Sequence, residues 1–166
     1  MFPIKRLLIF VLILVLIGSF IVLAVLRDNK PIFRKVEFGM TMDEVKNAEY
    51  AEMTSDFKNS IYYKGTDDDL LKNASITIGY FFNDEGLLNH IMVYYPYKSY
   101  DHDLYGYELQ MELNNRQQRY TRLVDRIDSV YGSISLKSDG QWEFDSYTIT
   151  LKQMPTGIQL DFKLNE

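Results

Sequence analysis

The chain has 166 residues, a net charge of −5 and no cysteine. The absence of cysteine excludes a disulfide framework, a thiolate zinc site, a cysteine nucleophile and an acylated lipoprotein cysteine. The aromatic content of 14% is too high for a disordered chain, because disordered segments are poor in aromatic residues.

Residues 7–26, LLIFVLILVLIGSFIVLAVL, are the only long apolar run in the sequence and contain no charged residue. Twenty helical residues span about 30 Å, the thickness of the hydrocarbon core of a bilayer. The run therefore predicts a transmembrane helix that acts as a signal anchor after a short tail, residues 1–6. The alternative is a cleaved signal peptide with its cleavage site at residues 22–24. The length favours the anchor, since the apolar region of a signal peptide usually has about 7–15 residues.

Charge divides the sequence into two regions. Residues 1–35 hold six basic residues and one acidic residue, whereas residues 36–166 hold 12 basic and 22 acidic residues, a net charge of −10. Phosphate groups repel a domain this acidic, so nucleic acid is not expected as a partner. Residues 27–35 are interpreted as a basic linker. Because long domains translocate largely regardless of flanking charge, we expect a single-pass protein of the cell membrane with an extracytoplasmic domain.

The stretch FGMTMDEVKNAE, residues 38–49, carries a complete helix start signal. Thr41 and Glu44 have the spacing of a capping box, in which each side chain accepts a hydrogen bond from the backbone N–H of the other residue. These residues predict a short helix over 42–50. A membrane-proximal stalk does not need so defined a start, so we expect the folded domain to begin near residue 36.

Apolar residues then recur with a period of two, which is typical of strands. Strands are predicted over residues 60–64, 75–82 and 87–95, with NDEG as the hairpin turn between the last two. In the third strand we expect one set of alternating residues to face the helices: Leu88, His90, Met92 and Tyr94. On this interpretation His90 is a structural residue.

A long helix is predicted over residues 104–131 and ends at Gly132. Residues of one face recur at spacings of three and four, which indicates a buried stripe. The members of this stripe are Leu109, Leu113, Arg116, Tyr120, Leu123, Ile127 and Val130. A dimeric coiled coil is the alternative interpretation of the same spacing.

Strands return in the last third, over residues 141–145, 146–153 and 157–164. A helix followed by three strands thus occurs twice, which predicts an α+β fold. We expect one globular domain, residues 36–166, made of two αβββ units, 36–95 and 96–166. Their strands would form an antiparallel sheet with helices on one face and solvent on the other.

The stretch FGMTMDEVKNAE also resembles the repeat opening of small bacterial envelope proteins. These include the small lipoprotein of the outer-membrane β-barrel assembly machine and the β-lactamase inhibitory protein, whose tandem αβ repeats form a concave sheet. The resemblance implies a place in the cell envelope and a protein-binding role. The chain departs from the family pattern in having no lipobox cysteine and no Leu-Gly-x-Pro after the first helix.

The sequence contains no glycine-rich phosphate loop, no Gly-x-Ser-x-Gly and no HExxH motif. We therefore assign no catalytic, cofactor-binding or metal-binding residue and do not expect an enzyme. One alternative is a small-ligand or metal-dependent enzyme centred on Asp101, His102 and Asp103 in the YDHD segment. The acidic run Asp67-Asp68-Asp69 lacks the glycine and spaced ligands of a calcium loop and is interpreted as a polar connector.

The segment 94–108, YYPYKSYDHDLYGYE, contains six tyrosines, and tyrosine suits binding surfaces because it offers apolar area and a hydroxyl with little rotamer entropy. The predicted wet face of the first unit adds further apolar side chains, which indicate a partner. The predicted partner-binding surface is Phe81, Ile91, Val93, Tyr95, Tyr97, Tyr100 and Tyr105. We therefore expect an envelope protein anchored in the bilayer through residues 7–26 that binds or scaffolds another protein. A structural subunit of a membrane complex is the remaining alternative.

Overall fold

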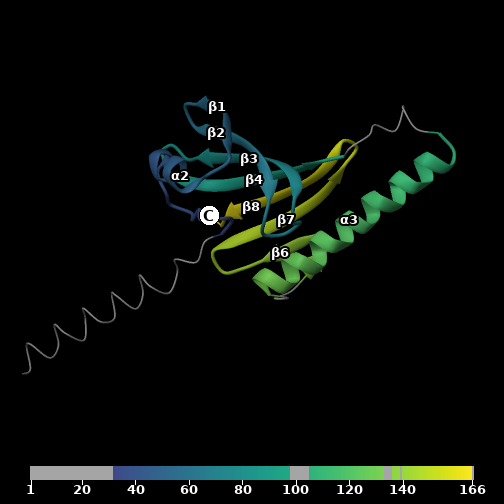
Figure 1. Cartoon of the computed structure of the whole chain (residues 1–166). Helices are drawn as coiled ribbons and strands as arrows, with labels where there is room; N and C mark the ends of the chain where they lie inside the picture. The colour runs from purple at the N-terminus through teal and green to yellow at the C-terminus, as the bar shows by residue number, and fades with distance from the viewer. Residues whose placement is uncertain (1–31, 98–104, 133–135, 139, 166) are drawn as a thin grey trace, which may run out of the picture. The chain divides into compact units, whose positions relative to one another are not determined.

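Two helices and eight strands make up the described part of the chain, which is residues 32–97, 105–132, 136–138 and 140–165 of the computed structural model (Figure 1). The helices are α2 (Met42–Ala48) and α3 (Tyr107–Tyr131). The strands are β1 (Glu52–Phe57), β2 (Ser60–Asp67), β3 (Ala74–Phe82), β4 (Leu88–Pro96), β5 (Leu136–Ser138), β6 (Gln141–Glu143), β7 (Tyr147–Met154) and β8 (Gly157–Leu164).

All eight strands belong to a single antiparallel sheet with the order β1-β2-β3-β4-β8-β7-β6-β5. Each helix is followed by four strands that pair with their neighbours in sequence, and the two sets of four meet where β4 pairs with β8. The junction runs from the pair His90 and Lys163 to the pair Pro96 and Gly157. In Figure 1 the two halves lie on either side of this junction, one blue to teal and one green to yellow.

The prediction of three strands after each helix is wrong, because β1 and β5 were missed. β1 is an edge strand, exposed at five of its six positions, so it lacks the alternation of buried and exposed residues by which strands are recognised. β5 has only three residues. The correct description is a helix and a four-stranded meander, twice.

The transmembrane helix predicted over residues 7–26 is a second correction. Neither helix in the described residues is long and apolar enough to cross a membrane. α2 has only seven residues, and α3 carries eight charged side chains among its 25 residues. Residues 7–26 and the tail 1–6 themselves lie outside the described residues. The structure therefore gives no support to a signal anchor.

Part of the predicted basic linker, residues 27–35, belongs to the folded unit. Phe33 and Val36 are almost fully buried. Arg34 Nη2 lies 3.3 Å from Glu49 Oε1, with both side chains buried, and Tyr80 donates a hydrogen bond of 2.6 Å to Glu49 Oε2. This buried network ties the incoming chain to the end of α2 and to β3.

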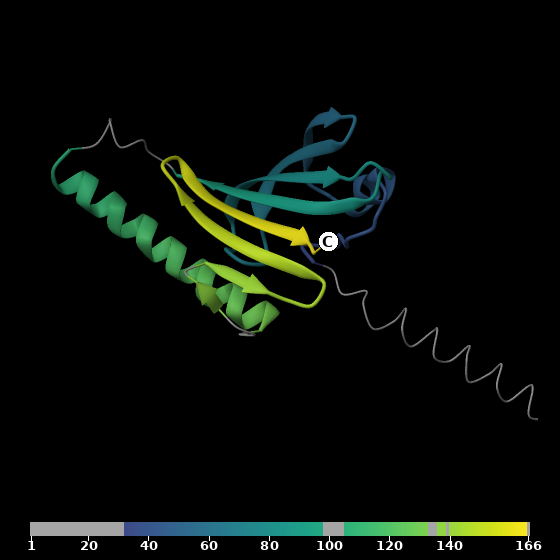
Figure 2. The same ribbon diagram turned by 180° about the vertical axis from the view of Figure 1, so that it is seen from behind.

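One face of the sheet, here called the core face, is covered by both helices (Figures 1 and 2). Cross-strand neighbours on this face are buried together, as in the row Ile78, Val93, Leu160 and Leu151. From the helices, Val45, Leu123 and Ile127 are fully buried against it. The buried side chains of the sheet on the core face are Ile61, Tyr63, Ile76, Ile78, Tyr80, Phe82, Leu88, Ile91, Val93, Tyr95, Trp142, Ile149, Leu151, Ile158, Leu160 and Phe162.

Only the second half of α3 packs on the sheet. Its first buried residue is Arg116, and the stripe members Leu113 and Val130 are 44% and 47% exposed. Figures 1 and 2 agree that the N-terminal end of α3 extends beyond the strands. The predicted stripe is therefore buried only in the middle, at Arg116, Leu123 and Ile127, and is exposed towards both ends. At the far end, the Tyr131 hydroxyl donates a 2.6 Å hydrogen bond to the carbonyl oxygen of Ile32.

The buried ion pair yields a first prediction. Arg34→Met leaves the Glu49 carboxylate buried without its cation, so we expect a loss of roughly 3–5 kcal/mol in the free energy of unfolding. Urea unfolding followed by the fluorescence of Trp142, the single and fully buried tryptophan, measures it. The double variant with Glu49→Gln removes both charges and should recover much of the loss. Equal losses in the single and double variants would contradict the role given to the pair.

A second prediction concerns alkaline pH. Burial is the main cause that raises the pKa of Tyr80, Tyr95 and Tyr131, and the nearby Glu49 and Asp67 carboxylates raise the first two further. An unfolded tyrosine titrates near pH 10. Because folding raises these pKa values, their contribution to stability is complete below about pH 10 and is lost as the pH rises above it.

We therefore expect the free energy of unfolding to fall steeply above pH 10, together with a late rise in tyrosinate absorbance. Tyr95→Phe should flatten the fall, because one buried titrating group is removed. Titration of every tyrosine near pH 10 with an unchanged fold would contradict this account.

Candidate functional site

One extra residue in β4 decides which of its side chains reach the second face of the sheet, here called the open face. Phe81 pairs with His90 and Phe82 pairs with Leu88, so Asn89 is an additional residue that forms a β-bulge. Leu88 is buried before the bulge, whereas the odd-numbered residues are buried after it. The alternation therefore shifts by one position.

The shift reverses the predicted faces of β4. Ile91, Val93 and Tyr95, predicted on the wet face, are fully buried on the core face. His90, Met92 and Tyr94, predicted to face the helices, are half-buried on the open face. The prediction applied a strict period of two along the whole strand, and a bulge breaks that period.

The remaining residues of the predicted partner surface do not gather at one place. Phe81 is half-buried on the open face. Tyr97 is half-buried, with the guanidinium of Arg116 4.3 Å from its ring centroid. Tyr105 is 79% exposed just before α3, and Tyr100 lies outside the described residues. Predicting the surface from tyrosine density therefore combined side chains from separate parts of the fold.

Three rings and an imidazole, which together we call the aromatic row, cross the open face of β1, β2, β3 and β4: Phe57, Tyr62, Phe81 and His90. Phe57 and Tyr62 meet edge to face with centroids 6.0 Å apart, and Tyr62 meets Phe81 in the same way at 5.7 Å. Phe81 stacks on His90 at 4.8 Å. Such pairs are worth about 0.5–1.5 kcal/mol each beyond the area they bury.

Gly79 makes room for the aromatic row. It lies on β3 between Tyr62 on β2 and Met92 on β4. A Cβ atom at this position would lie 3.0 Å from ring carbons of both Tyr62 and Phe81. Contacts this short are tighter than nine in ten real Cβ contacts, so a larger residue would require the two rings to move apart by a few tenths of an ångström.

Polar groups continue the row onto β8. His90 Nε2 lies 2.8 Å from Asp161 Oδ1, and the Gln159 side-chain amide donates a 2.8 Å hydrogen bond to Asp161 Oδ2. The His90 side chain is 30% exposed and that of Asp161 is 15% exposed. The open face thus changes from aromatic on one half of the sheet to hydrogen-bonding groups at the junction.

The geometry does not favour catalysis at this pair. A histidine and an aspartate act in nucleophilic catalysis when a hydroxyl or thiol is hydrogen-bonded to the free ring nitrogen. Among the described residues, no such hydrogen bond joins a serine or threonine hydroxyl to His90.

Metal binding finds no support in the described residues, where no group of three or more His, Asp or Glu side chains could hold an ion. Asp101, His102 and Asp103 lie outside the described residues. Asp67, interpreted as part of a polar connector, is only 1% exposed. Its carboxylate accepts hydrogen bonds from the backbone N–H groups of residues 69, 70 and 71 and from the Tyr95 hydroxyl.

Comparison with known proteins adds no further constraint. No family model matches the chain, and no match is found among curated proteins or among solved structures. The resemblance to small envelope repeat proteins, which depends on residues 38–49, therefore stays a prediction.

The sequence analysis missed most of the open-face site, namely Phe57, Tyr62, His90, Met92, Tyr94, Gln159 and Asp161. A signal for β4 was present, because Ile91 and Val93 are β-branched and apolar whereas His90 is polar. That contrast favours burial of the odd-numbered residues. No comparable signal marked Asp161, which reaches His90 only through the pairing of β4 with β8.

Proposed function

We propose that the chain is a protein-binding module, not an enzyme, and that its partner binds the open face at the aromatic row. The observation that carries the proposal is the continuity of this row across four strands on a sheet face that neither described helix covers. Contiguous exposed apolar patches on a protein surface commonly mark interaction sites.

The chemistry of the row suits a protein partner. Aromatic side chains offer large contact area and lose little rotamer entropy on binding, which is why they are common at interaction hot spots. Phe57 at the outer edge is 59% exposed. Met92, half-buried on the open face of β4, adds a flexible apolar group that adapts to the shape of a partner.

The polar groups at one end of the row would fix the orientation of a bound partner. Asp161, Gln159 and His90 offer hydrogen-bond donors and acceptors at one end of the apolar surface. A hollow of about 410 Å³, lined in part by Thr148, Thr150 and Lys163, extends the same face onto β7. An apolar centre with a polar rim is the usual anatomy of a protein interface.

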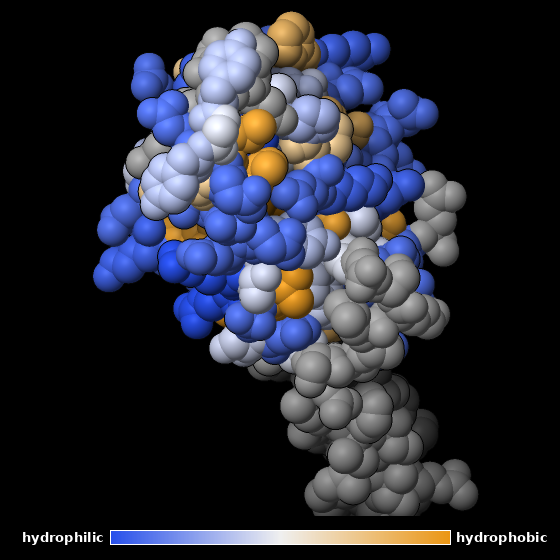
Figure 3. Space-filling view, turned by 90° about the vertical axis from the view of Figure 1, so that its right-hand side faces the viewer, coloured by the Kyte–Doolittle hydropathy of each residue, from blue (hydrophilic) through white to orange (hydrophobic). Residues whose placement is uncertain are grey.

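Other exposed apolar residues do not form an equally continuous surface. The N-terminal part of α3 exposes Tyr107, Met111 and Leu113. In Figure 3, which looks from the side where α3 begins, the surface is largely hydrophilic and its hydrophobic groups form small separate patches. The open face is therefore the better candidate for binding a partner.

Site-specific photocrosslinking in intact cells tests the proposal. A photoreactive phenylalanine analogue at position 62, 81 or 92 should capture the same protein partner from all three positions. The matched control is position 121, since Thr121 is an exposed residue of α3, which covers the opposite, core face of the sheet. Phe81→Ala should reduce the capture from position 92. Capture from position 121 that equals capture from the row would contradict the proposal.

A further inference from the structure

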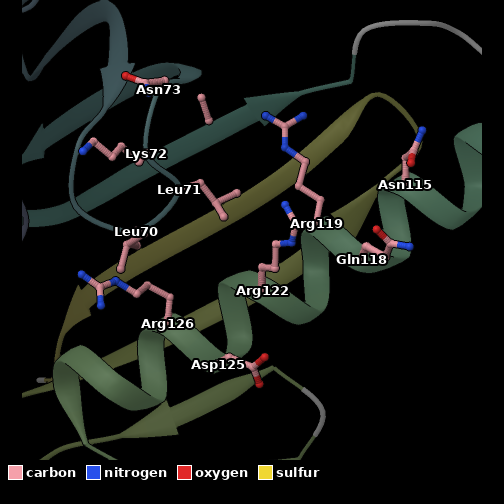
Figure 4. Close-up of a pocket in the computed structure, with 11 residues that line it drawn as sticks. Leu70, Leu71, Lys72, Asn73, Asn115, Gln118, Arg119, Arg122, Asp125 and Arg126 are labelled. Carbon is pink, nitrogen blue, oxygen red and sulfur yellow. The ribbon is translucent and has the colours of Figure 1, made fainter.

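A groove lies between α3 and the loop of residues 68–73 that joins β2 to β3 (Figure 4). The cavity has a volume of about 770 Å³. Its positively charged lining on the helix comprises Arg119, Arg122 and Arg126, which project toward the loop, and Lys72 adds a fourth cation from the loop. We call this cavity the basic groove.

The conformation of the loop wall of the basic groove is fixed by hydrogen bonds. The buried Asp67 carboxylate accepts three backbone hydrogen bonds from the loop and a fourth from Tyr95. Asn73 closes the loop with a φ of 63°, a left-handed conformation that asparagine tolerates. Its backbone N–H donates a 2.8 Å hydrogen bond to the carbonyl oxygen of Asp67.

The helix wall is equally well positioned. Residues three and seven positions apart share one face of a helix, so the three arginines form a row along α3. Arg119 Nη1 donates to the carbonyl oxygen of Pro96 at 3.0 Å, and Arg126 Nε donates to the carbonyl oxygen of Asp69 at 3.1 Å. These bonds fix two side chains without neutralising them, because a guanidinium has five N–H donors and a carbonyl carries no net charge.

Positive charge is concentrated here against the overall balance of the chain. The lining has four cations and one acid, Asp125, whereas the whole chain has a net charge of −5. In Figure 4 the Asp125 carboxylate points away from the loop. Arg122 has no ion pair or side-chain hydrogen bond with any described residue.

We propose that the basic groove binds an extended acidic segment of a partner protein. The arginine row spans seven residues of helix, about 10.5 Å, which matches about three residues of extended peptide. A row of cations suits carboxylates spaced along a chain, whereas a single phosphate needs cations that converge on one point.

The uncharged lining fits the same ligand. Leu70, Leu71 and Ala74 provide apolar contacts, and the side-chain amides of Asn73, Asn115 and Gln118 can pair with a peptide backbone. The basic groove is formed by α3 and a loop, so this proposal is independent of the aromatic row on the open face.

Binding of a fluorescent hexaglutamate peptide to the 166-residue chain tests the proposal. We expect binding that weakens as salt is raised, because exposed charges are screened. Arg122→Gln should weaken it about tenfold, which corresponds to 1.4 kcal/mol. Glutamine keeps a similar helix propensity, so α3 should remain folded. Lys152→Gln removes the same charge away from the groove and should leave the affinity unchanged.

A second variant distinguishes the loss of a binding contact from a local change in the structure of α3. Lys72→Gln changes the loop wall alone and should also weaken binding. No binding of hexaglutamate, or equal affinities for Arg122→Gln and Lys152→Gln, would overturn the proposal. Competition by inorganic phosphate or by an oligonucleotide at concentrations as low as those of the peptide would also overturn it, since the groove would then be a general anion site.

Discussion

The bulge at Asn89 is the constraint on which the rest of the structure depends. β4 lies at the middle of the sheet and pairs with β3 on one side and β8 on the other. A strand that changes phase by one residue moves its whole apolar set to the other face. With the bulge, Ile91 and Val93 join the core and His90 joins Phe81 on the open face. The bulge therefore determines both which residues of β4 enter the core and which of them joins the aromatic row.

Two buried carboxylates hold the connections around the core face in similar ways. Glu49 follows α2 and accepts hydrogen bonds from the next two backbone N–H groups and from Tyr80. Asp67 ends β2 and accepts hydrogen bonds from three backbone N–H groups and from Tyr95. In both cases a buried charge is tolerated because several donors surround it. The first network anchors the entering chain, and the second shapes the loop wall of the basic groove.

Local signals allowed much of the fold to be predicted from the sequence. The capping box at Thr41 and Glu44 is confirmed, with the Thr41 N–H 2.7 Å from Glu44 Oε2. The long helix, predicted over 104–131, is observed over Tyr107–Tyr131. Such features depend on residues a few positions apart, whose chemistry alone determines the local backbone.

The candidate sites depend on contacts between distant residues, so the same reasoning could not find them. The aromatic row joins four strands, and the basic groove joins residues about 50 positions apart. The net charge of −10 over residues 36–166 argued against nucleic acid as a partner, but a net charge is an average and does not say where each charge lies. It therefore did not indicate the cluster of cations in the basic groove.

Thiol labelling along β4 tests the central claim, the change of face at Asn89, most directly. The chain has no cysteine, so each single-cysteine variant carries one reporter. Met92→Cys should react rapidly in the folded protein, because position 92 lies on the open face. Val93→Cys, at a fully buried position, should react only as fast as the core opens. Rapid labelling at position 93 with protection at position 92 would contradict the account.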